Sequence, residues 1–409
     1  MTDEMMRRHT RLQVTLLTGL LFFFLQTAVA DTVDTDPLNR DPQVREAFDR
    51  FYIMDYTGSI SHFEAIRSQH PKNPMATGYL LYASLFKELF RLDLLDTTFY
   101  ANDGFLTGKH TVVEDPQVRD QIKGLSDQAV DEANQQLKTN PNDVNALFAR
   151  GWAKSLEATY LAMVERSFSS ALRLALQARN DHMRVLQLDP NYVDAKLVTG
   201  TYEYVVGALS LPFKILMGFA GIHGSKATGM EMLHDAGTRG VITSVEARIC
   251  MMLFLRREAK YQEAEQIAEG LVKEYPRDFL FHLEVANIQK DSGDGLKAIA
   301  SYREVIELAR KPGYFPSAHP ELVYFGLGDT LRGQKLYADA VEAYDSAAYQ
   351  PTTSPELKRR CLLAAGQVYD LMHDHDKARQ QYQAVIDAGS DSAQADQARK
   401  FMKTAYEGR

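Results

Sequence analysis

Apolar residues recur along most of this chain at the three- and four-residue spacing of an amphipathic helix. Two neighbouring runs show the pattern clearly, and each places its apolar residues on one stripe: Tyr324, Leu327, Gly328 and Leu331, then Tyr337, Ala340, Tyr344 and Ala347. The short stretch 332–335, with the sequence Arg-Gly-Gln-Lys, separates the two runs. The pattern therefore predicts a pair of helices joined by a tight turn.

The spacing of proline, alanine and glycine indicates that such helix pairs repeat. Three prolines each follow an alanine by twelve residues and precede another small residue by ten. The three sets are Ala129, Pro141 and Gly151; Ala178, Pro190 and Gly200; and Ala264, Pro276 and Ala286. A small residue lets two helices approach closely, and proline ends the second helix before the next pair begins.

These positions resemble the small, large and aromatic pattern of the tetratricopeptide repeat, a unit of about 34 residues. Second-helix alanines at 129, 178, 227, 264, 298, 340 and 378 are 49, 49, 37, 34, 42 and 38 residues apart, so the array is irregular. A degenerate pair is expected at Gln43–Pro71, with Phe63 at the aromatic position, and a capping helix at Ser392–Tyr406. The resemblance implies an all-α, tetratricopeptide-like α-solenoid of about eight irregular helix pairs with a C-terminal capping helix.

Three stretches depart from the repeat and divide the chain. Ser155–Gln177 keeps the helical pattern and predicts lengthened helices, whereas Leu209–Gly224 contains proline and glycines and predicts an inserted loop. Asp93–Asp115 is a non-repeat stretch. We therefore expect an N-terminal segment at 1–30, degenerate helical repeats at 31–115, repeats with lengthened helices and the inserted loop at 116–240, and a regular array with its cap at 241–409.

The first thirty residues have the composition of a signal peptide. Arg7, Arg8 and Arg11 precede an apolar run at Leu12–Leu25, and small residues at Ala28–Ala30 follow at cleavage spacing. The run is shorter than the roughly 20 residues of a membrane-spanning helix. We expect an exported protein, periplasmic or secreted after cleavage near Ala30; an uncleaved N-terminal anchor is the alternative.

The charge argues against a nucleic-acid-binding protein, and the cysteine content argues against a disulfide-stabilised fold. The formal charge of −8 comes from 54 acidic and 46 basic residues in 409, and the basic residues form no stripe for a phosphate backbone, so we expect no nucleic-acid partner. The two cysteines, Cys250 and Cys361, each lie in an apolar helical pattern. We interpret both as small buried residues rather than as a disulfide.

The candidate catalytic and cofactor motifs do not hold in a helical context. His373-Asp374-His375-Asp376 is dense in metal ligands but falls at the turn between two helices, so we expect a solvated turn and no metal. Gly218–Lys226 lacks the Gly-Lys-Ser/Thr order and the preceding strand of a phosphate-binding loop, and Ser225 or Gly224 is expected to cap a helix. No Gly-x-Ser-x-Gly turn occurs, so we predict no cofactor and no enzymatic activity.

The inserted loop admits two interpretations. Leu209–Ile222 is rich in large apolar residues for a surface loop. It either forms an exposed flap that meets a membrane or a partner, or it folds back inside the solenoid.

Stacked helix pairs leave a concave groove lined by the first helices, and function is expected there. The repeat register puts three polar pairs at inward positions, which would bind a peptide backbone or a terminal carboxylate: Asn287 and Lys290, Asp329 and Arg332, and Gln367 and Asp370. The alternative is that they only form the hydrated lining of an empty groove.

Two functions from different classes remain open. The first is a protein–protein interaction scaffold in the cell envelope, with a protein or peptide partner in the groove. The second is a periplasmic small-solute-binding accessory subunit of a transporter, with a pocket enclosed by Leu209–Gly224. The chain is weakly similar to tetratricopeptide proteins of the mitochondrial outer membrane and to periplasmic tetratricopeptide components of solute transporters.

Overall fold

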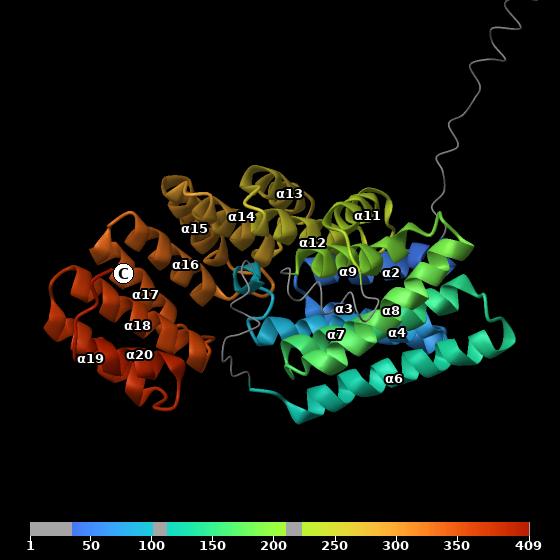
Figure 1. Cartoon of the computed structure of the whole chain (residues 1–409), viewed down its shortest axis with the longest axis horizontal. Coiled ribbons are helices and arrows are strands. Elements are labelled where there is room, and N and C mark those ends of the chain that lie inside the picture. The colour runs from blue at the N-terminus through green and yellow to red at the C-terminus, as the bar shows by residue number, and fades with distance from the viewer. Residues whose placement is uncertain (1–34, 101–112, 210–222, 409) are drawn as a thin grey trace, which may run out of the picture. The chain divides into compact units, whose positions relative to one another are not determined.

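Acidic, asparagine and serine side chains begin most of the helices. Figure 1 shows the computed structural model, which describes residues 35–100, 113–209 and 223–408. The side chains of five helix-capping residues each accept a hydrogen bond from a main-chain N–H in the first turn: Asp41, Asn73, Asp143, Asp278 and Ser354. Such caps satisfy donors that a helix leaves unpaired at its start. The described residues form seventeen α-helices and contain no strand.

Each of the described helices packs on its neighbours in sequence, and together they form eight pairs and a final single helix. The pairs are α2 (Pro42–Tyr52) with α3 (Tyr56–Gln69), α4 (Pro74–Arg91) with α6 (Pro116–Thr139), α7 (Val144–Met163) with α8 (Phe168–Leu188), α9 (Lys196–Ala208) with α11 (Lys226–Arg239), α12 (Ser244–Arg257) with α13 (Tyr261–Glu274), α14 (Phe279–Asp291) with α15 (Gly295–Ala309), α16 (Pro320–Gly333) with α17 (Tyr337–Ala348), and α18 (Pro355–Leu371) with α19 (His375–Asp387). The last helix is α20 (Ala393–Phe401), and short 3₁₀ turns are η1 (Pro37–Arg40), η2 (Thr97–Tyr100) and η3 (Val193–Ala195).

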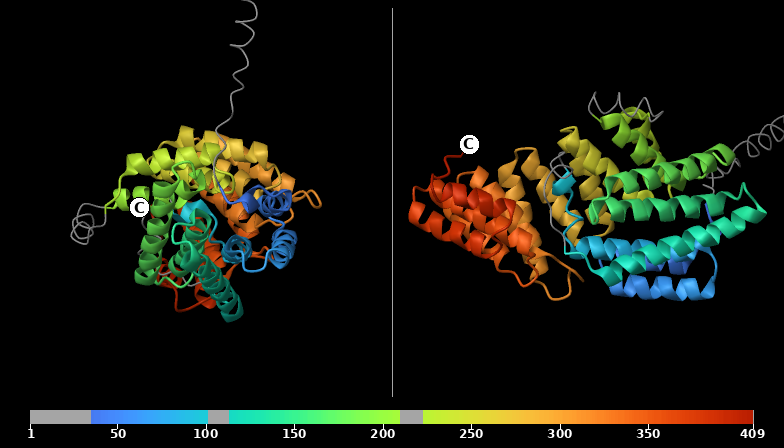
Figure 2. Two further views of the ribbon diagram at one scale, coloured as in Figure 1. Left: turned by 90° about the vertical axis from the view of Figure 1, so that its right-hand side faces the viewer. Right: turned by 60° about the horizontal axis from the view of Figure 1, so that its bottom comes forward.

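Each second helix also packs on the first helix of the next pair, as in a solenoid (Figure 2). The predicted all-α, tetratricopeptide-like α-solenoid is confirmed, with a capping helix that begins after Ser392. None of the described helices is long and apolar enough to span a membrane.

Small residues lie where the two helices of a pair cross. Six of the seven predicted second-helix alanines are completely buried: Ala129, Ala178, Ala264, Ala298, Ala340 and Ala378. The prediction for Ala227 is wrong, because that residue is exposed on α11. Gly229 takes the crossing position instead, and a Cβ there would lie 2.5 Å from the main-chain nitrogen of Tyr204 on α9.

In several pairs, an aromatic side chain of the second helix lies four positions after the small residue at the crossing. This side chain packs on a small residue of the first helix. Tyr344 packs on Gly328, where a Cβ would lie 2.7 Å from the ring, and Tyr382 packs on Gly366, where that distance is 2.5 Å. His182 takes the same position in α8 and stacks on the ring of Phe148. Burial lowers the pKa of His182 to about 4, so the imidazole is neutral at physiological pH.

The predicted lengthened helices are present in α7 and α8, which have 20 and 21 residues and meet at the turn 164–167. Ser225 caps α11, as predicted, by accepting from the N–H of Thr228. Residues 1–30 and most of the inserted loop, 210–222, lie outside the described residues. Both cysteines are free: Cys361 is fully buried and Cys250 only partly, and burial raises their pKa values to about 12 and about 11.

Hydrogen bonds join the N-terminal pairs to the middle of the chain. The hydroxyl of Thr35 donates to Asp194 of η3 over 2.8 Å. The hydroxyls of Tyr52 on α2 and Tyr82 on α4 both donate to the same carboxylate oxygen of Glu246 on α12. First helices that are far apart in the sequence therefore pack together.

Candidate functional site

The six predicted groove residues all lie on the first helices α14, α16 and α18, at two positions of the repeat. Asn287, Asp329 and Gln367 follow the small crossing residue by one position; Lys290, Arg332 and Asp370 follow it by four. We call the surface that α12, α14, α16 and α18 form on the side of these residues the first-helix face.

Three of these residues also hold the repeat together. The hydroxyls of buried tyrosines donate to them: Tyr302 to Asn287 over 2.6 Å, Tyr344 to Asp329 over 2.7 Å, and Tyr382 to Asp370 over 2.7 Å. Burial raises the pKa of all three tyrosines, so the hydroxyls remain donors. One oxygen of each acceptor is therefore already used inside its own helix pair.

A small pocket of about 70 Å³ gathers three of the six residues. Asn287, Lys290 and Asp329 line it, and the Arg360 guanidinium lies 4.6 Å from the centre of the Phe325 ring in its wall. The remaining lining residues are Leu322, Gly326 and Leu357 from the first helices, and Asp96 and Thr98 from the N-terminal part of the chain. The pocket thus has apolar walls and carries both signs of charge.

The chain's own residues Asp93–Tyr100, which we call the inserted segment, lie on the first-helix face. Glu284 of α14 accepts from the N–H of Thr97 over 3.0 Å and from its hydroxyl over 2.5 Å. Arg256 of α12 donates to the hydroxyls of Thr97 (2.7 Å) and Thr98 (3.2 Å). The Arg256 and Glu284 side chains are 1% and 3% exposed, so this contact excludes water.

Two further contacts extend the segment along the face. Arg257 of α12 donates to the main-chain oxygen of Tyr100 over 2.7 Å, and Asn287 donates to Asp96 over 3.3 Å. Burial raises the pKa of Glu284, and the Arg256 guanidinium opposes that rise. The start of the non-repeat stretch Asp93–Asp115 therefore occupies the first-helix face. The sequence predicted the stretch but not this contact.

Two of the other three predicted residues, Arg332 and Asp370, contact the C-terminal tail, and Arg332 holds the third, Gln367. Arg332 donates to Gln367 over 2.9 Å and to the hydroxyl of Tyr406 over 2.8 Å, and its guanidinium lies 5.1 Å from the centre of that ring. Asp370 accepts from the N–H of Tyr406 over 2.8 Å and pairs with His375 over 2.7 Å. The structure thus separates the six residues into two groups, each beside a piece of the chain itself.

The predicted turn falls at His373 and Asp374, and His375 and Asp376 begin α19. Asp374 caps α19, and His373 has the positive φ of 63° that a tight turn requires. The stretch Gly218–Lys226 lies mostly outside the described residues.

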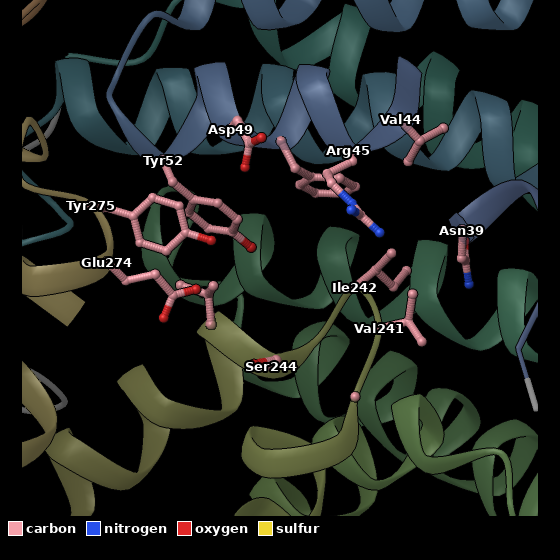
Figure 3. Close-up of a pocket in the computed structure, with 13 residues that line it drawn as sticks. Asn39, Val44, Arg45, Asp49, Tyr52, Val241, Ile242, Ser244, Glu274 and Tyr275 are labelled. Carbon is pink, nitrogen blue, oxygen red and sulfur yellow. The ribbon is translucent and has the colours of Figure 1, made fainter. Parts of the chain in front are cut away.

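A larger cavity of about 320 Å³ lies elsewhere, between α2 and the residues around the start of α12 (Figure 3). Arg45 and Asp49 extend from α2 at its exposed rim, and the rings of Tyr52 and Tyr275 lie 4.9 Å apart in its wall. The rest of its lining consists of Asn39, Val44, Phe48, Gly240, Val241, Ile242, Ser244, Val245 and Glu274. The described ends of Leu209–Gly224 do not line it.

The repeated pairing and the glycine–tyrosine crossings define the class of protein: the chain is a tetratricopeptide-like α-solenoid. No protein-family model matches it.

Solved structures similar to this chain have low sequence identity. They include a chain of the APC/C hetero-tetramer Cut9–Hcn1 (13% identity, TM-score 0.49, 91% of this chain and 57% of that chain), yeast Tom70 (13%, 0.41, 88% and 87%), and a tetratricopeptide repeat protein from Parabacteroides merdae (15%, 0.34, 78% and 97%). This chain therefore spans little more than half of the Cut9–Hcn1 chain that it matches.

Proposed function

We propose that this protein is an exported interaction scaffold, and not an enzyme, that binds a polypeptide partner on the first-helix face. The observation that carries the proposal is the inserted segment. The face already holds a stretch of polypeptide through both its main chain and its side chains, at Thr97 and Tyr100. A surface that binds one irregular segment with buried polar groups has the donors and acceptors needed for another.

The pocket beside the inserted segment is the proposed anchor point for the partner. Its volume of about 70 Å³ fits one side chain rather than a whole ligand. Leu322, Phe325 and Leu357 would cover the apolar part of that side chain, while Lys290 and Asp329 would bind the neighbouring peptide groups. Buried apolar anchors with a polar rim are typical of hot spots in interfaces.

Export to the cell envelope is the second part of the proposal, and it is supported by the sequence of residues 1–30. Arginines followed by a short apolar run and small residues are typical of a cleaved signal peptide. Mass spectrometry of the protein from its native host tests this part. A mature N-terminus near Asp31 supports export, whereas an intact N-terminus supports the anchor alternative or retention in the cell.

A matched pair of charge variants tests the binding face. Lys290→Gln with Asp329→Asn removes two of the four charged side chains that line the pocket, and the new asparagine still accepts from Tyr344. Arg303→Gln with Asp339→Asn makes the same change on the exposed second helices α15 and α17. In affinity captures from native envelope extract, a protein partner identified with wild type is expected to be lost with the first pair and retained with the second. Equal capture by both variants, or a co-purifying small molecule in place of a protein, would contradict the proposal.

The cavity of Figure 3 is the one observation that favours the solute-binding alternative. Its volume of about 320 Å³ is at the lower end of the range for small-molecule sites. Arg45 and Asp49 at the rim would bind a polar or zwitterionic solute. Native mass spectrometry of wild type and of Arg45→Gln with Asp49→Asn tests it: a bound small molecule that only wild type carries would favour solute binding over the scaffold.

A further inference from the structure

Three potential metal ligands from distant parts of the chain meet where the inserted segment begins. Asp93 is the first residue of the segment, and His319 and Glu321 stand at the start of α16. His319 Nδ1 lies 2.5 Å from Asp93 Oδ1 and 3.6 Å from Glu321 Oε1, and the three donor atoms all lie within 4.8 Å of one another.

The negative charge in this cluster is buried and unbalanced. The side chains of Asp93 and Glu321 are 8% and 0% exposed, and their ion pairs among the described residues are with His319 alone. With both carboxylates ionised, even a protonated imidazole leaves one of their two charges without a partner. Because a buried unpaired charge is costly, a cation in the cluster would stabilise the fold.

One carboxylate oxygen points into the cluster with no hydrogen bond. Glu321 Oε2 accepts from the hydroxyl of Thr352 over 2.6 Å, which fixes the side chain. Glu321 Oε1 is buried, has no hydrogen-bond partner and faces His319 Nδ1. Buried polar atoms in proteins are nearly always paired, so this oxygen independently indicates a missing ligand.

We propose that Asp93, His319 and Glu321 bind one divalent transition-metal ion. An imidazole nitrogen with two carboxylate oxygens suits zinc, manganese or iron, whereas calcium and magnesium prefer oxygen ligands alone. Zinc at about 2.1 Å from each donor places tetrahedral ligands about 3.4 Å apart, so His319 Nδ1 and Asp93 Oδ1 move apart by about 1 Å on binding.

The ion would fix the start of the inserted segment to the first-helix face. It joins residues that are 226 positions apart in the sequence, and it ties the start of the segment to the helix that contributes Leu322 to the pocket. The ring of Phe90 lies 4.1 Å from that of His319 and covers one side of the cluster. This site rests on its own geometry and does not depend on peptide binding at the face.

Calorimetric titration of the chelator-treated full chain with zinc tests the proposal. Wild type is expected to bind one zinc ion per chain, and Asp93→Asn and Glu321→Gln are each expected to weaken binding at least tenfold. Asparagine suits position 93, where φ is 59°, and a glutamine at position 321 keeps an acceptor for Thr352, so both variants preserve the local structure. Zinc is also expected to slow hydrogen exchange of the Thr97 amide in wild type and not in the two variants.

The matched control removes the other histidine–aspartate cluster. His373→Ala with His375→Ala deletes the imidazoles of the α18–α19 turn, where zinc would bind adventitiously, and is expected to leave the titration unchanged. The proposal is overturned if wild type binds no zinc, if this control abolishes binding, or if Asp93→Asn and Glu321→Gln bind zinc as wild type does.

Discussion

Replacing Thr97 with valine should release the inserted segment from the first-helix face. The side chain keeps its shape but loses a hydroxyl that donates to Glu284 over 2.5 Å and accepts from Arg256 over 2.7 Å. Glu284 and Arg256 remain paired with each other at 3.2 Å, so neither charge is left without a partner. Hydrogen bonds to charged groups each contribute about 1.5–3 kcal/mol; because Arg256 and Glu284 keep each other as partners, we expect the net loss to equal about one such bond rather than two.

Native-state hydrogen exchange at the Thr97 amide measures this loss directly, because the amide donates to Glu284 and is exposed only when the segment opens. At 1.4 kcal/mol per factor of ten, the exchange rate should rise by roughly 10- to 150-fold. Thr98→Val is the matched control, since it removes a single longer bond of 3.2 Å at a partly buried hydroxyl, and it should raise the rate clearly less than Thr97→Val does. Equal exchange rates in Thr97→Val and wild type would refute the claim that the Thr97 hydroxyl holds the inserted segment on the first-helix face.

Two further predictions concern the repeat itself. Gly366→Ala puts a methyl group 2.5 Å from the ring of Tyr382 and should destabilise the fold by up to about 2 kcal/mol. Gly270→Ala on α13, with open space around it, should stabilise the fold by about 0.5–1 kcal/mol. If urea denaturation gives both variants a free-energy change of the same sign, the close packing of Gly366 on Tyr382 is contradicted. His182 has a folded pKa of about 4 against about 6.5 unfolded, so the unfolded state binds the proton more tightly and falling pH favours unfolding. The contribution of His182 to the free energy of unfolding is fully present above about pH 6.5, and about 3 kcal/mol of it is lost by about pH 4. His182→Phe should flatten the plot of the free energy of unfolding against pH in this range. Parallel plots for His182→Phe and wild type would show that the buried imidazole does not cause the pH dependence.

The helix pairs could be predicted from sequence because their determinants are local. Gly366 and Tyr382 lie in adjacent helices of one pair, so the spacing that joins them recurs with each repeat. The register failed at Ala227, where the non-repeat stretch Leu209–Gly224 precedes α11 and a second small residue, Gly229, stands two positions later. Small residues in succession do not indicate which one faces the neighbouring helix.

The occupants of the face could not be predicted, because they depend on contacts between distant segments. Asn287 and Lys290 were placed correctly on a first helix, but nothing near them in the sequence indicates that Asp96 lies opposite. The same holds for Tyr406, which folds back on Arg332 after α20 has ended. The length of the Asp93–Asp115 stretch between two helices was the available signal.

Site-specific photo-crosslinking tests the central claim that the first-helix face binds a polypeptide partner. A photoreactive phenylalanine analogue replaces Phe325 in the pocket wall, or Leu296, which is 73% exposed on the second helix α15, and the protein is irradiated in its native envelope extract. The account predicts that one protein crosslinks at position 325, that it does not crosslink at position 296, and that Lys290→Gln with Asp329→Asn abolishes the product. A partner that crosslinks at 296 and not at 325, or no protein product at position 325, would contradict it.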